Sequence, residues 1–343
     1  MSDTIYSSSN KKVTYDDFQL LKVVGRGSFG KVLQVKKKDD GKIFAMKILD
    51  KSKVMKTKQQ KHTRDEKSIL SSLNHPFVVQ LHYAFQTPEK LYMVMDFING
   101  GELFHRLDEA EYLSEEETKH YTAELCLALI HLHKNGIVYR DLKPENVLID
   151  RNGNVKMTDF GLSKQLAGED EQTNTFCGTP DYLAPEILQG KGYGVGVDWW
   201  SLGVLVYEML AGYTPFASED EENQNETYQN ILNMDPEFLP TMPGDAVDFI
   251  EQCLKKNPDE RITDDQVKNH PWFADVNWDD LLAGKVTPPW KPAVKDASDT
   301  SNIDETFTNE DVNGNTPPGD ASGLTGDEFA GFTFQNEAPI GEQ

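Results

Sequence analysis

A short segment near the middle of the chain brings together several side chains that can do chemistry. Residues 138–150 read Val-Tyr-Arg-Asp-Leu-Lys-Pro-Glu-Asn-Val-Leu-Ile-Asp, so an arginine, a lysine, an asparagine and carboxylates lie within a few positions of one another. The apolar residues around its two ends, 137–139 and 147–149, have the composition of short buried strands. A loop held at both ends by packed strands is a frequent location for catalytic groups. We therefore predict a catalytic loop at this position.

Two further motifs accompany this loop: Gly-Arg-Gly-Ser-Phe-Gly at residues 25–30 and Asp-Phe-Gly at residues 159–161. Glycine motifs of this spacing also bind dinucleotides, but in those proteins a helix follows the glycines. Here residues 31–35 show the alternating, β-branched pattern of a strand. The loop also lacks the Gly-Lys-Ser/Thr ending of a Walker motif. A strand–loop–strand hairpin can place its backbone N–H groups over nucleotide phosphates, the alternative being a plain hairpin turn. Together with the catalytic loop, the motifs indicate phosphoryl transfer.

The residue types at these positions match the parts of such a site. Asp141 is placed to accept the proton of an attacking hydroxyl, and Lys143 can neutralise charge on the transferred group. Asn146 and Asp159 offer the hard oxygen ligands that Mg²⁺ prefers. An alternative in which Asp141 and Asn146 only form a turn is disfavoured by the Asp-Phe-Gly motif downstream.

A lysine and a glutamate precede the catalytic loop in the order that such a site requires. Lys47 ends an apolar strand, where its cation can bind the α- and β-phosphates of a nucleotide. Glu66, on a predicted helix, is its expected ion-pair partner. Taken singly, either residue is more often solvated surface, and only their order after the glycine loop favours the pairing.

The composition limits the class of protein. The chain has 343 residues, of which 38% are hydrophobic, enough for one large or two modest cores, and no apolar run long enough to span a membrane. Its net charge of −23 argues against nucleic-acid binding and favours basic partners. The three widely spaced cysteines fit buried thiols in a reducing compartment better than disulfides or a metal site. The N-terminus lacks a signal or myristoylation pattern. We expect a monomer in the cytoplasm, with the nucleus as a second compartment.

The spacing of apolar residues predicts an α+β, bilobal protein. The small, mostly β lobe spans residues 18–97 and the larger, mostly α lobe residues 98–273. Ser114 and Glu117 form a capping-box pattern that opens a long helix ending at Asn135-Gly136. The other expected elements are strands at 18–24, 31–35, 43–47, 78–85 and 91–96, and helices at 60–73, 198–211, 225–232, 246–255 and 264–270.

The two ends of the chain differ in composition from the lobes. Residues 1–17 form a lead-in, of which positions 1–15 are polar and serine-rich and are expected to be mobile. Residues 274–343 form a tail that contains no Lys or Arg beyond Lys295, and its acidic composition predicts that it forms no core. Within the tail, the aromatic segment 329–334 indicates docking onto another part of the chain.

With further motifs included, residues 18–343 resemble an AGC-family serine/threonine protein kinase of the protein kinase B, serum/glucocorticoid-regulated and ribosomal S6 kinase branch. The likeness includes Thr-Phe-Cys-Gly-Thr-Pro-Asp-Tyr at 175–182, Ala-Pro-Glu at 184–186 and Asp-Trp-Trp-Ser-Leu-Gly at 198–203. Lys-Pro-Glu-Asn at 143–146 is the serine/threonine form of the catalytic loop. Tyr139 stands where many kinases have histidine, as is usual in this family.

The resemblance implies ATP and Mg²⁺ as cofactors, with the tail wrapping the small lobe. It also implies that Thr179 bridges Asp141 and Lys143, that Glu186 pairs with a buried Arg261, and that Asp198 anchors the catalytic loop. The implied ATP-binding residues are Val24, Gly25, Gly27, Gly30, Val32, Ala45, Lys47, Met95, Asp96, Ile98, Glu102, Leu148 and Thr158.

The resemblance further implies protein substrates and an upstream activating kinase. Acidic Glu102, Glu145 and Glu208 match positions that bind arginines before the acceptor residue, for which arginine suits better than lysine because it pairs with carboxylates in a bidentate manner. Thr179 is expected in the same peptide-binding segment. The alternative is that these are scattered surface acids.

Three threonines match the phosphorylation sites of the family: Thr175 in the activation loop, Thr316 in the turn motif and Thr333 in the hydrophobic motif. Arg140, Lys164 and His62 are the expected cationic partners of a phosphorylated Thr175. The hydrophobic motif is expected to dock on the small lobe beside the Glu66 helix, with Lys67 and Gln86 near Thr333. The lipid-binding domain of the protein kinase B group is expected to be absent.

Two other functions compete with an active protein kinase. A kinase-shaped scaffold without activity requires the loss of Lys47, Asp141, Asn146 or Asp159, and all four are present. A small-molecule kinase of similar fold is disfavoured by the peptide-binding segment 179–186.

Overall fold

The computed structural model describes residues 12–27, 29–168, 171–218, 220, 223–312 and 328–336. These residues group into two compact units. The first contains the described residues up to Lys58, then Leu81–Phe97, and those from Asp304 onward. The second contains Gln59–Gln80 and Ile98–Ile303, so that the segment with the predicted helix 60–73 groups with the larger unit.

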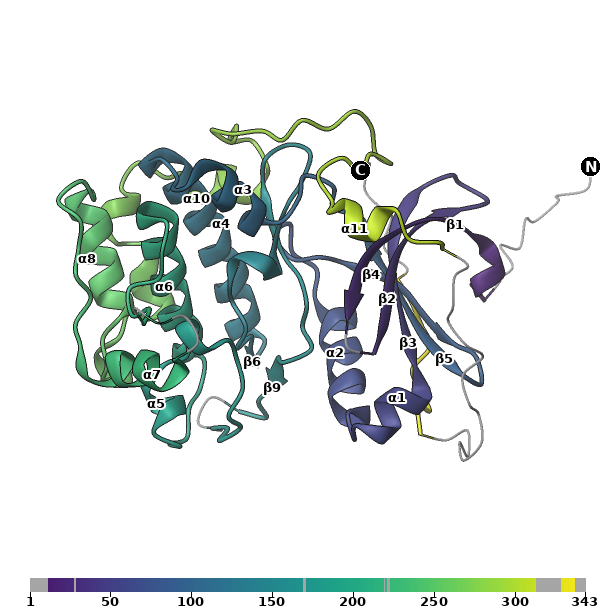
Figure 1. The fold of residues 1–343 in the computed structure, drawn as a ribbon, viewed down its shortest axis with the longest axis horizontal. Helices are drawn as coiled ribbons and strands as arrows, with labels where there is room; N and C mark the ends of the chain where they lie inside the picture. Colours follow the sequence, from purple (N-terminus) through teal and green to yellow (C-terminus); the bar gives the residue numbers. More distant parts are fainter. Residues whose placement is uncertain are drawn as a thin grey trace, which may run out of the picture. The chain divides into compact units, whose positions relative to one another are not determined.

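In its described part, the first unit is built on a six-stranded antiparallel sheet with the strand order β1-β2-β3-β5-β4-β10 (Figure 1). Alternating apolar residues produce the long strands, as predicted. Two short helices belong to the same unit, α1 (Lys51–Lys56) and α11 (Glu305–Thr308). The strands are β1 (Phe18–Gly27), β2 (Gly30–Lys37), β3 (Ile43–Asp50), β4 (Leu81–Gln86), β5 (Lys90–Asp96) and β10 (Phe334–Gln335).

The prediction of a strand from residue 78 onward was wrong at its start, because β4 begins at Leu81. Val78 and Val79 instead belong to the second unit, where Val78 pairs with Met157 and the Val79 N–H donates to the Met157 carbonyl at 3.0 Å. Both segments are apolar, so periodicity could not separate them.

The prediction that residues 1–15 are mobile was wrong for the described part of that segment. Val13 and Tyr15 pack against the core of the sheet, and the Tyr15 and Tyr92 ring centroids are 5.4 Å apart. A short 3₁₀ helix, Tyr15–Asp17, begins there with a capping box between Thr14 and Asp17. Partial burial of these two side chains therefore fixes a segment whose average composition is polar.

The second unit is mainly helical. Figure 1 shows α4, α6 and α8 packed together in this unit. The short strands pair as β6 with β9 and β7 with β8. The helices are α2 (Gln60–Ser72), α3 (Leu103–Ala110), α4 (Glu115–Lys134), α5 (Pro185–Leu188), α6 (Gly196–Ala211), α7 (Gln224–Asn233), α8 (Gly244–Cys253), α9 (Asp264–Val267) and α10 (Trp278–Leu282), and the strands are β6 (Ile137–Val138), β7 (Val147–Ile149), β8 (Val155–Met157) and β9 (Lys164–Gln165).

Two helix predictions need correction. The helix predicted at 264–270 ends at Val267, because His270 has an extended backbone before Pro271 and caps the next 3₁₀ turn. Only half of the predicted capping box forms at α4: the Ser114 hydroxyl accepts from the Glu117 N–H at 3.2 Å. The Glu117 carboxylate instead binds Arg106 in a bidentate manner at 2.9 and 3.0 Å, which is the stronger partner. In the described part of the chain, no helix is both long and apolar enough to cross a bilayer.

The tail contributes to both units, contrary to the prediction that it forms no core. In the second unit, the Asn99 side chain donates to the carbonyls of Asp296 and Asp299 at 3.0 and 3.3 Å. In the first, Phe329 and Phe332 are buried at 1% and 2% exposure, and β10 pairs with β4. The prediction that the aromatic segment docks is therefore confirmed, although the added strand was not predicted.

The contacts of the docked segment differ in detail from the expectation. The Gln86 amide donates to the Phe329 carbonyl at 2.9 Å and accepts from the Lys51 ammonium at 2.8 Å, so Gln86 contacts Phe329 and not Thr333. The Lys51 ammonium also lies 5.6 Å from the centre of the Phe329 ring. Thr333 is exposed. The turn-motif residue Thr316 lies outside the described residues.

A buried ion pair joins α5 to the segment that follows α8, as expected. The Arg261 guanidinium donates to both oxygens of the Glu186 carboxylate at 2.7 and 2.9 Å, and it also donates to the Gly196 and Lys255 carbonyls. Both side chains are almost completely buried. Their desolvation is therefore offset only while both partners are present.

We predict that Glu186→Ala lowers the free energy of unfolding by about 3–5 kcal/mol, because Arg261 is left as a buried, unpaired charge. The measurement is urea unfolding of the whole chain. Lys285→Ala removes a lysine from an exposed pair with Asp280 and serves as the control, with an expected change of roughly 0–1 kcal/mol. Equal effects of the two substitutions would contradict the structural role assigned to the buried pair.

Candidate active site

The predicted catalytic loop lies between β6 and β7, and its polar side chains converge on one carboxylate. The Asn146 amide donates to the Asp141 carbonyl and to Asp141 Oδ2, both at 2.7 Å. The Lys143 ammonium donates to Thr179 Oγ1 at 2.9 Å, and this hydroxyl donates to Asp141 Oδ1 at 3.2 Å. The Lys143 ammonium itself lies 3.9 Å from Asp141 Oδ1. The expected bridge through Thr179 is therefore present.

The surroundings of Asp141 act on its pKa in opposite directions. Burial raises the pKa, and the nearby Asp159 adds to this effect. The Lys143 cation and the hydrogen bonds from Asn146 and Thr179 lower it, and the net result is a pKa above the ordinary value. A half-buried carboxylate with a raised pKa is a better proton acceptor than an exposed one.

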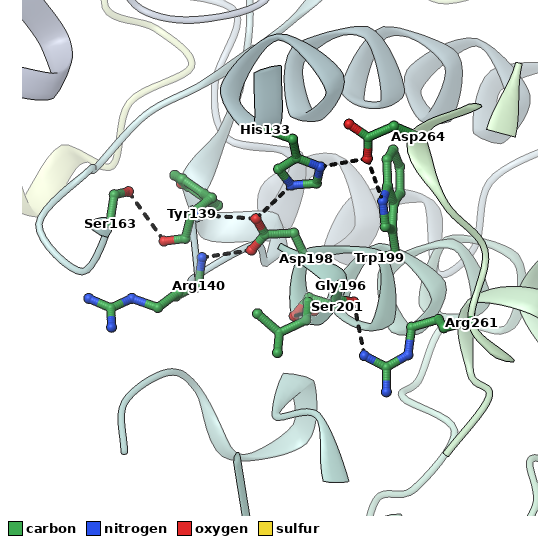
Figure 2. Close-up of polar contacts among 11 residues, drawn as sticks. His133, Tyr139, Arg140, Ser163, Gly196, Asp198, Trp199, Ser201, Arg261 and Asp264 are labelled. Carbon is green, nitrogen blue, oxygen red and sulfur yellow. Dashed lines mark hydrogen bonds and ion pairs between the residues drawn. The ribbon is translucent and has the colours of Figure 1, made fainter. Parts of the chain in front are cut away.

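The backbone of the loop is held in an unusual conformation. Arg140 has a φ of 71° and Asp159 a φ of 51°, both in the left-handed region that non-glycine residues seldom adopt. The Arg140 N–H donates to Asp198 Oδ1 at 2.8 Å and the Tyr139 N–H to Asp198 Oδ2 at 2.9 Å (Figure 2). Asp198 on α6 thus anchors the loop, as the resemblance implied.

Two residues that the sequence reasoning missed extend this anchor. His133 on α4 is hydrogen-bonded to Asp198 through Nε2 at 2.9 Å and to Asp264 through Nδ1 at 2.8 Å (Figure 2). The indole N–H of Trp199 donates to the same oxygen of Asp264 at 3.0 Å. Nothing in the spacing along the chain could pair residues this far apart.

The candidate metal ligands have the donor chemistry that Mg²⁺ prefers. Asn146 offers an amide oxygen and Asp159 an exposed carboxylate, and the backbone joins the two regions through a hydrogen bond from the Thr158 N–H to the Asn146 carbonyl at 3.0 Å. No group of three or more His, Cys, Asp or Glu able to hold a metal occurs in the described residues. Two oxygen ligands of this kind suit a cation that takes its other ligands from substrate phosphates and water.

In the first unit, the glycine motif occupies the ends of β1 and β2. Gly25, Gly27 and Gly30 all lie in this hairpin. A Cβ on Gly30 would lie 1.7 Å from the Ile48 carbonyl oxygen, so only glycine fits there. Val24 lies at an irregularity of β1, between the pairs Val23–Leu33 and Gly25–Val32.

The sheet register places several of the predicted ATP-binding residues on one face. Lys47 is opposite Val32, and Ala45 is opposite Met95. Ala45 and Lys47 are two residues apart in β3, so their side chains point to the same face. The same face of the sheet therefore presents Val32, Ala45, Lys47 and Met95. Asp96, at the end of β5, accepts a hydrogen bond from His82 at 2.7 Å.

The remaining predicted nucleotide residues belong to the second unit. Glu102 and Leu148 form an isolated β-bridge, and the Gly100 N–H donates to the Ile149 carbonyl at 2.9 Å. Ile98, Glu102, Leu148 and Thr158 are all half-buried. Glu66, the expected partner of Lys47, is buried on α2 of this unit.

A contact between the tail and the glycine hairpin was also missed by the sequence reasoning. The Glu310 carboxylate accepts from Arg26 on β1 at 2.6 and 2.7 Å and lies 3.3 Å from the Lys31 ammonium on β2. The hydrogen bond from Arg26 lowers the pKa of Glu310, and the hydrogen bond from Lys31 adds a smaller effect in the same direction. One tail residue thus contacts both strands of the hairpin, and α11, just before it, packs against β1 (Figure 1).

Two of the acids expected to bind substrate act on one another. Burial raises the pKa of Glu208 on α6 to about 7, and the charges of Glu145 and Asp181 contribute, although a hydrogen bond from the Tyr182 hydroxyl opposes the shift. Glu145 is exposed on the catalytic loop. The result is a group of acidic side chains that includes Glu145 of the catalytic loop, to which a cationic peptide would be attracted.

The segment around Thr175 is connected to the catalytic loop. The Arg140 guanidinium donates to the Tyr193 hydroxyl at 3.3 Å, and this hydroxyl donates to the Thr175 carbonyl at 2.6 Å. The Thr175 side chain is exposed, and its hydroxyl lies 3.4 Å from that of Thr173. Of the other expected cations, Lys164 lies on β9 and His62 on α2, where it is hydrogen-bonded to Gln59.

A glycine hairpin followed by a lysine-bearing strand, together with a loop that orients an aspartate, an asparagine and a lysine, defines a protein kinase. Comparison with known proteins agrees: residues 18–273 match the protein kinase domain and residues 294–334 the protein kinase C terminal domain. The chain therefore belongs to the protein kinase family, as an AGC-type serine/threonine kinase. The predicted family, fold class and enzyme class are confirmed.

Several curated proteins are similar over most of this chain. Protein kinase 2 of Dictyostelium discoideum is 49% identical over 97% of this chain and 70% of its own length. The RAC family serine/threonine-protein kinase homolog of the same organism is 48% identical over 88% of this chain and 68% of its own. Serine/threonine-protein kinase Sgk1 of Danio rerio is 46% identical over 89% and 71%, respectively. The chain spans only about half the length of several fungal relatives.

Proposed function

We propose that this kinase transfers the γ-phosphate of ATP to serine or threonine hydroxyls that follow arginine residues, with Asp141 as the group that receives the hydroxyl proton. The observation that carries this proposal is the convergence of Asn146, Thr179 and Lys143 on the Asp141 carboxylate. With both oxygens hydrogen-bonded, the carboxylate has one orientation, and its raised pKa suits it to accept a proton.

The other residues of the site have complementary tasks. Lys143 neutralises charge that develops on the transferred phosphoryl group, and its bond to Thr179 holds it in position. Asn146 and Asp159 would hold Mg²⁺, which when bound neutralises the phosphate charge. Backbone N–H groups of the glycine hairpin, with Lys47, would hold the phosphates, and the apolar residues Val32, Ala45 and Met95 on the same sheet face would contact the adenine.

We predict that Asp141→Asn lowers kcat by roughly 10²–10⁴-fold, because the amide keeps the shape of the side chain but cannot take a proton. The measurement is transfer of labelled phosphate from ATP to a peptide with arginines before its serine. Asp275→Asn, on the surface of the same unit, is the control and should leave kcat unchanged. Activity of the Asp141 variant near that of the control would refute the proposed role.

The preference for arginine is supported by Glu145 and Glu208. Both carboxylates are near the catalytic loop, and Glu208 is partly buried, where ionic hydrogen bonds are stronger than in water. Arginine forms two parallel bonds with a carboxylate, which favours it over lysine. Glu102, the third acid expected to bind substrate, is placed beside Leu148.

We predict that the preference for arginine depends on pH. Glu208 has a pKa of about 7, so it becomes protonated as the pH falls through this value and loses its attraction for a cation that stays charged. The ratio of kcat/KM for an arginine peptide to that for its alanine counterpart should fall roughly tenfold between pH 8 and pH 6. Glu208→Gln should show the low ratio at every pH. A ratio that is constant with pH in the unaltered chain would exclude this role of Glu208.

Activation by phosphorylation is supported by the surroundings of Thr175. A phosphothreonine brings about −1.5 to −2 charges, which can be paired by the guanidinium of Arg140 next to Asp141. The hydroxyl of Tyr193 already joins this guanidinium to the backbone of Thr175. An upstream kinase would supply the modification, and Thr316 and Thr333 would be further sites in the tail.

We predict that Thr175→Ala prevents activation. Protein whose Thr175 phosphorylation is verified by mass should have a kcat at least tenfold higher than the unphosphorylated chain, because the new ion pair orders the segment beside the catalytic loop. Asn174→Ala, at the exposed neighbouring position, is the control and should remain activatable. Full activity of the Thr175→Ala chain would rule the site out as a switch.

The proposed setting is the cytoplasm. All three cysteines are free thiols, which fits a reducing compartment, and cell fractionation can check this assignment.

A further inference from the structure

A continuous series of polar contacts connects the start of α9 to the catalytic loop. It begins at Asp264, passes through the His133 ring to Asp198, and ends at the backbone N–H groups of Tyr139 and Arg140 (Figure 2). The distances along it are 2.8, 2.9, 2.9 and 2.8 Å, so every contact is a good hydrogen bond. Its outer end is partly exposed, since the Asp264 side chain is 26% accessible to solvent.

The series contains one buried charge, the carboxylate of Asp198, that its surroundings must compensate. The Asp198 side chain is completely buried, at 0% exposure, and an ionised carboxylate in such a place requires hydrogen bonds and an opposite charge. Two backbone N–H groups supply dipoles. The ring of His133, itself buried, supplies the opposite charge if it is protonated.

Asp264 acts on the charge of this ring. Burial lowers the pKa of His133, but the hydrogen bonds to Asp198 and Asp264, and then their charges, outweigh it and raise the pKa to about 9. These two carboxylates, one from α6 and one from α9, are the charges that act on the ring. At neutral pH both ring nitrogens therefore carry protons, and both contacts are donated by an imidazolium.

The position of Asp264 is itself fixed. The Trp199 indole donates to the same carboxylate oxygen that contacts His133, and the Trp199 and His133 rings meet edge to face at a centroid distance of 5.4 Å. Asp198 and Trp199 are neighbours on α6. One short stretch of α6 thus holds the ring from one side directly and from the other side through Asp264.

The far end of the series bears on the reacting groups. Arg140 has a φ of 71°, a conformation that must be imposed by its contacts, and Asp141 is the next residue. If the bonds from Asp198 weaken, Arg140 can relax toward a commoner conformation and turn the Asp141 carboxylate away from the acceptor hydroxyl.

We propose that Asp264 is a positioning residue for phosphoryl transfer: it keeps His133 protonated against Asp198, and Asp198 in turn keeps the backbone of the catalytic loop in its working conformation. Asp264 does not touch substrate, and it acts through His133. This proposal rests on the proposed function in one respect: it takes Asp141 as the catalytic group whose position changes when the support of Asp198 is lost.

The variant that tests this proposal is Asp264→Asn in the whole chain, phosphorylated at Thr175 to the same extent as the unaltered protein. Asparagine keeps the size of the side chain and an oxygen for the Trp199 indole, but it removes the negative charge. Asp265→Asn is the matched control, because this neighbouring aspartate is exposed on the same helix.

The expected result is a change in the pH profile of kcat. With the charge gone, the pKa of His133 falls, so the ring loses its proton at a lower pH and the support of Asp198 is lost above that pH. Between pH 6 and pH 8.5, kcat of Asp264→Asn should fall on the order of 10- to 100-fold relative to the unaltered chain, the scale of a displaced catalytic group. At pH 6 the kcat of Asp264→Asn should approach that of the unaltered chain. The KM for ATP should be the same in the two proteins at pH 6 and at pH 8.5.

Three outcomes would overturn the proposal. One is an unchanged profile in Asp264→Asn. Another is a loss of kcat that is equal at every pH, which indicates only structural damage. The third needs no variant: the ¹⁵N signals of the His133 ring in the unaltered chain must report an imidazolium at pH 7.5, and a neutral ring refutes the mechanism even if the variant fails to fold. Activity in the Asp141→Asn chain would refute the role of Asp141 as proton acceptor. The ¹⁵N signals would still show whether the His133 ring is protonated, so the two failures can be told apart.

Discussion

The second unit depends on one buried carboxylate. Asp198 lies at the centre of a helical core with no exposure to solvent, and its oxygens are shared among two backbone N–H groups and a histidine. A charge in such surroundings is tolerated only with its partners in place. Two of these partners are the backbone N–H groups of Tyr139 and Arg140. The same hydrogen bonds therefore compensate the buried charge of Asp198 and fix the conformation of the catalytic loop.

In the first unit, side chains are positioned by the regular geometry of the sheet and not by a buried charge. There the relevant side chains are aligned by the regular geometry of an antiparallel sheet, in which alternate residues of β3 and their partners across the ladder share a face. The register of the strands alone therefore places Val32, Ala45 and Met95, the apolar residues proposed to contact the adenine, on one face of the sheet. The catalytic loop, by contrast, is irregular and requires individual hydrogen bonds and left-handed backbone at Arg140 and Asp159.

The tail shows how average composition can mislead. Its acidic residues predict disorder, yet two phenylalanines are buried, and a short strand adds to the edge of the sheet at β4. A few aromatic side chains bury enough surface to hold a segment whose other residues remain solvated. Glu310, one of those acids, binds both strands of the glycine hairpin, so charge that looked merely solvating makes a specific contact.

The sequence by itself determined the class of protein, the catalytic loop and most of the regular elements, because these depend on short-range patterns: the alternation of β1 to β5, the serine that opens α4, and the spacing of Asp141, Lys143 and Asn146. It misplaced the start of β4, because Val78 and Val79 are as apolar as the strand that follows them. It also misplaced the end of α9, which stops at Val267 because His270 has an extended backbone before Pro271. Only the tertiary structure decided that His133 meets Asp264 and that Arg26 meets Glu310. Contacts between residues more than a hundred positions apart depend on how the helices and strands pack, and local residue patterns carry no information about that.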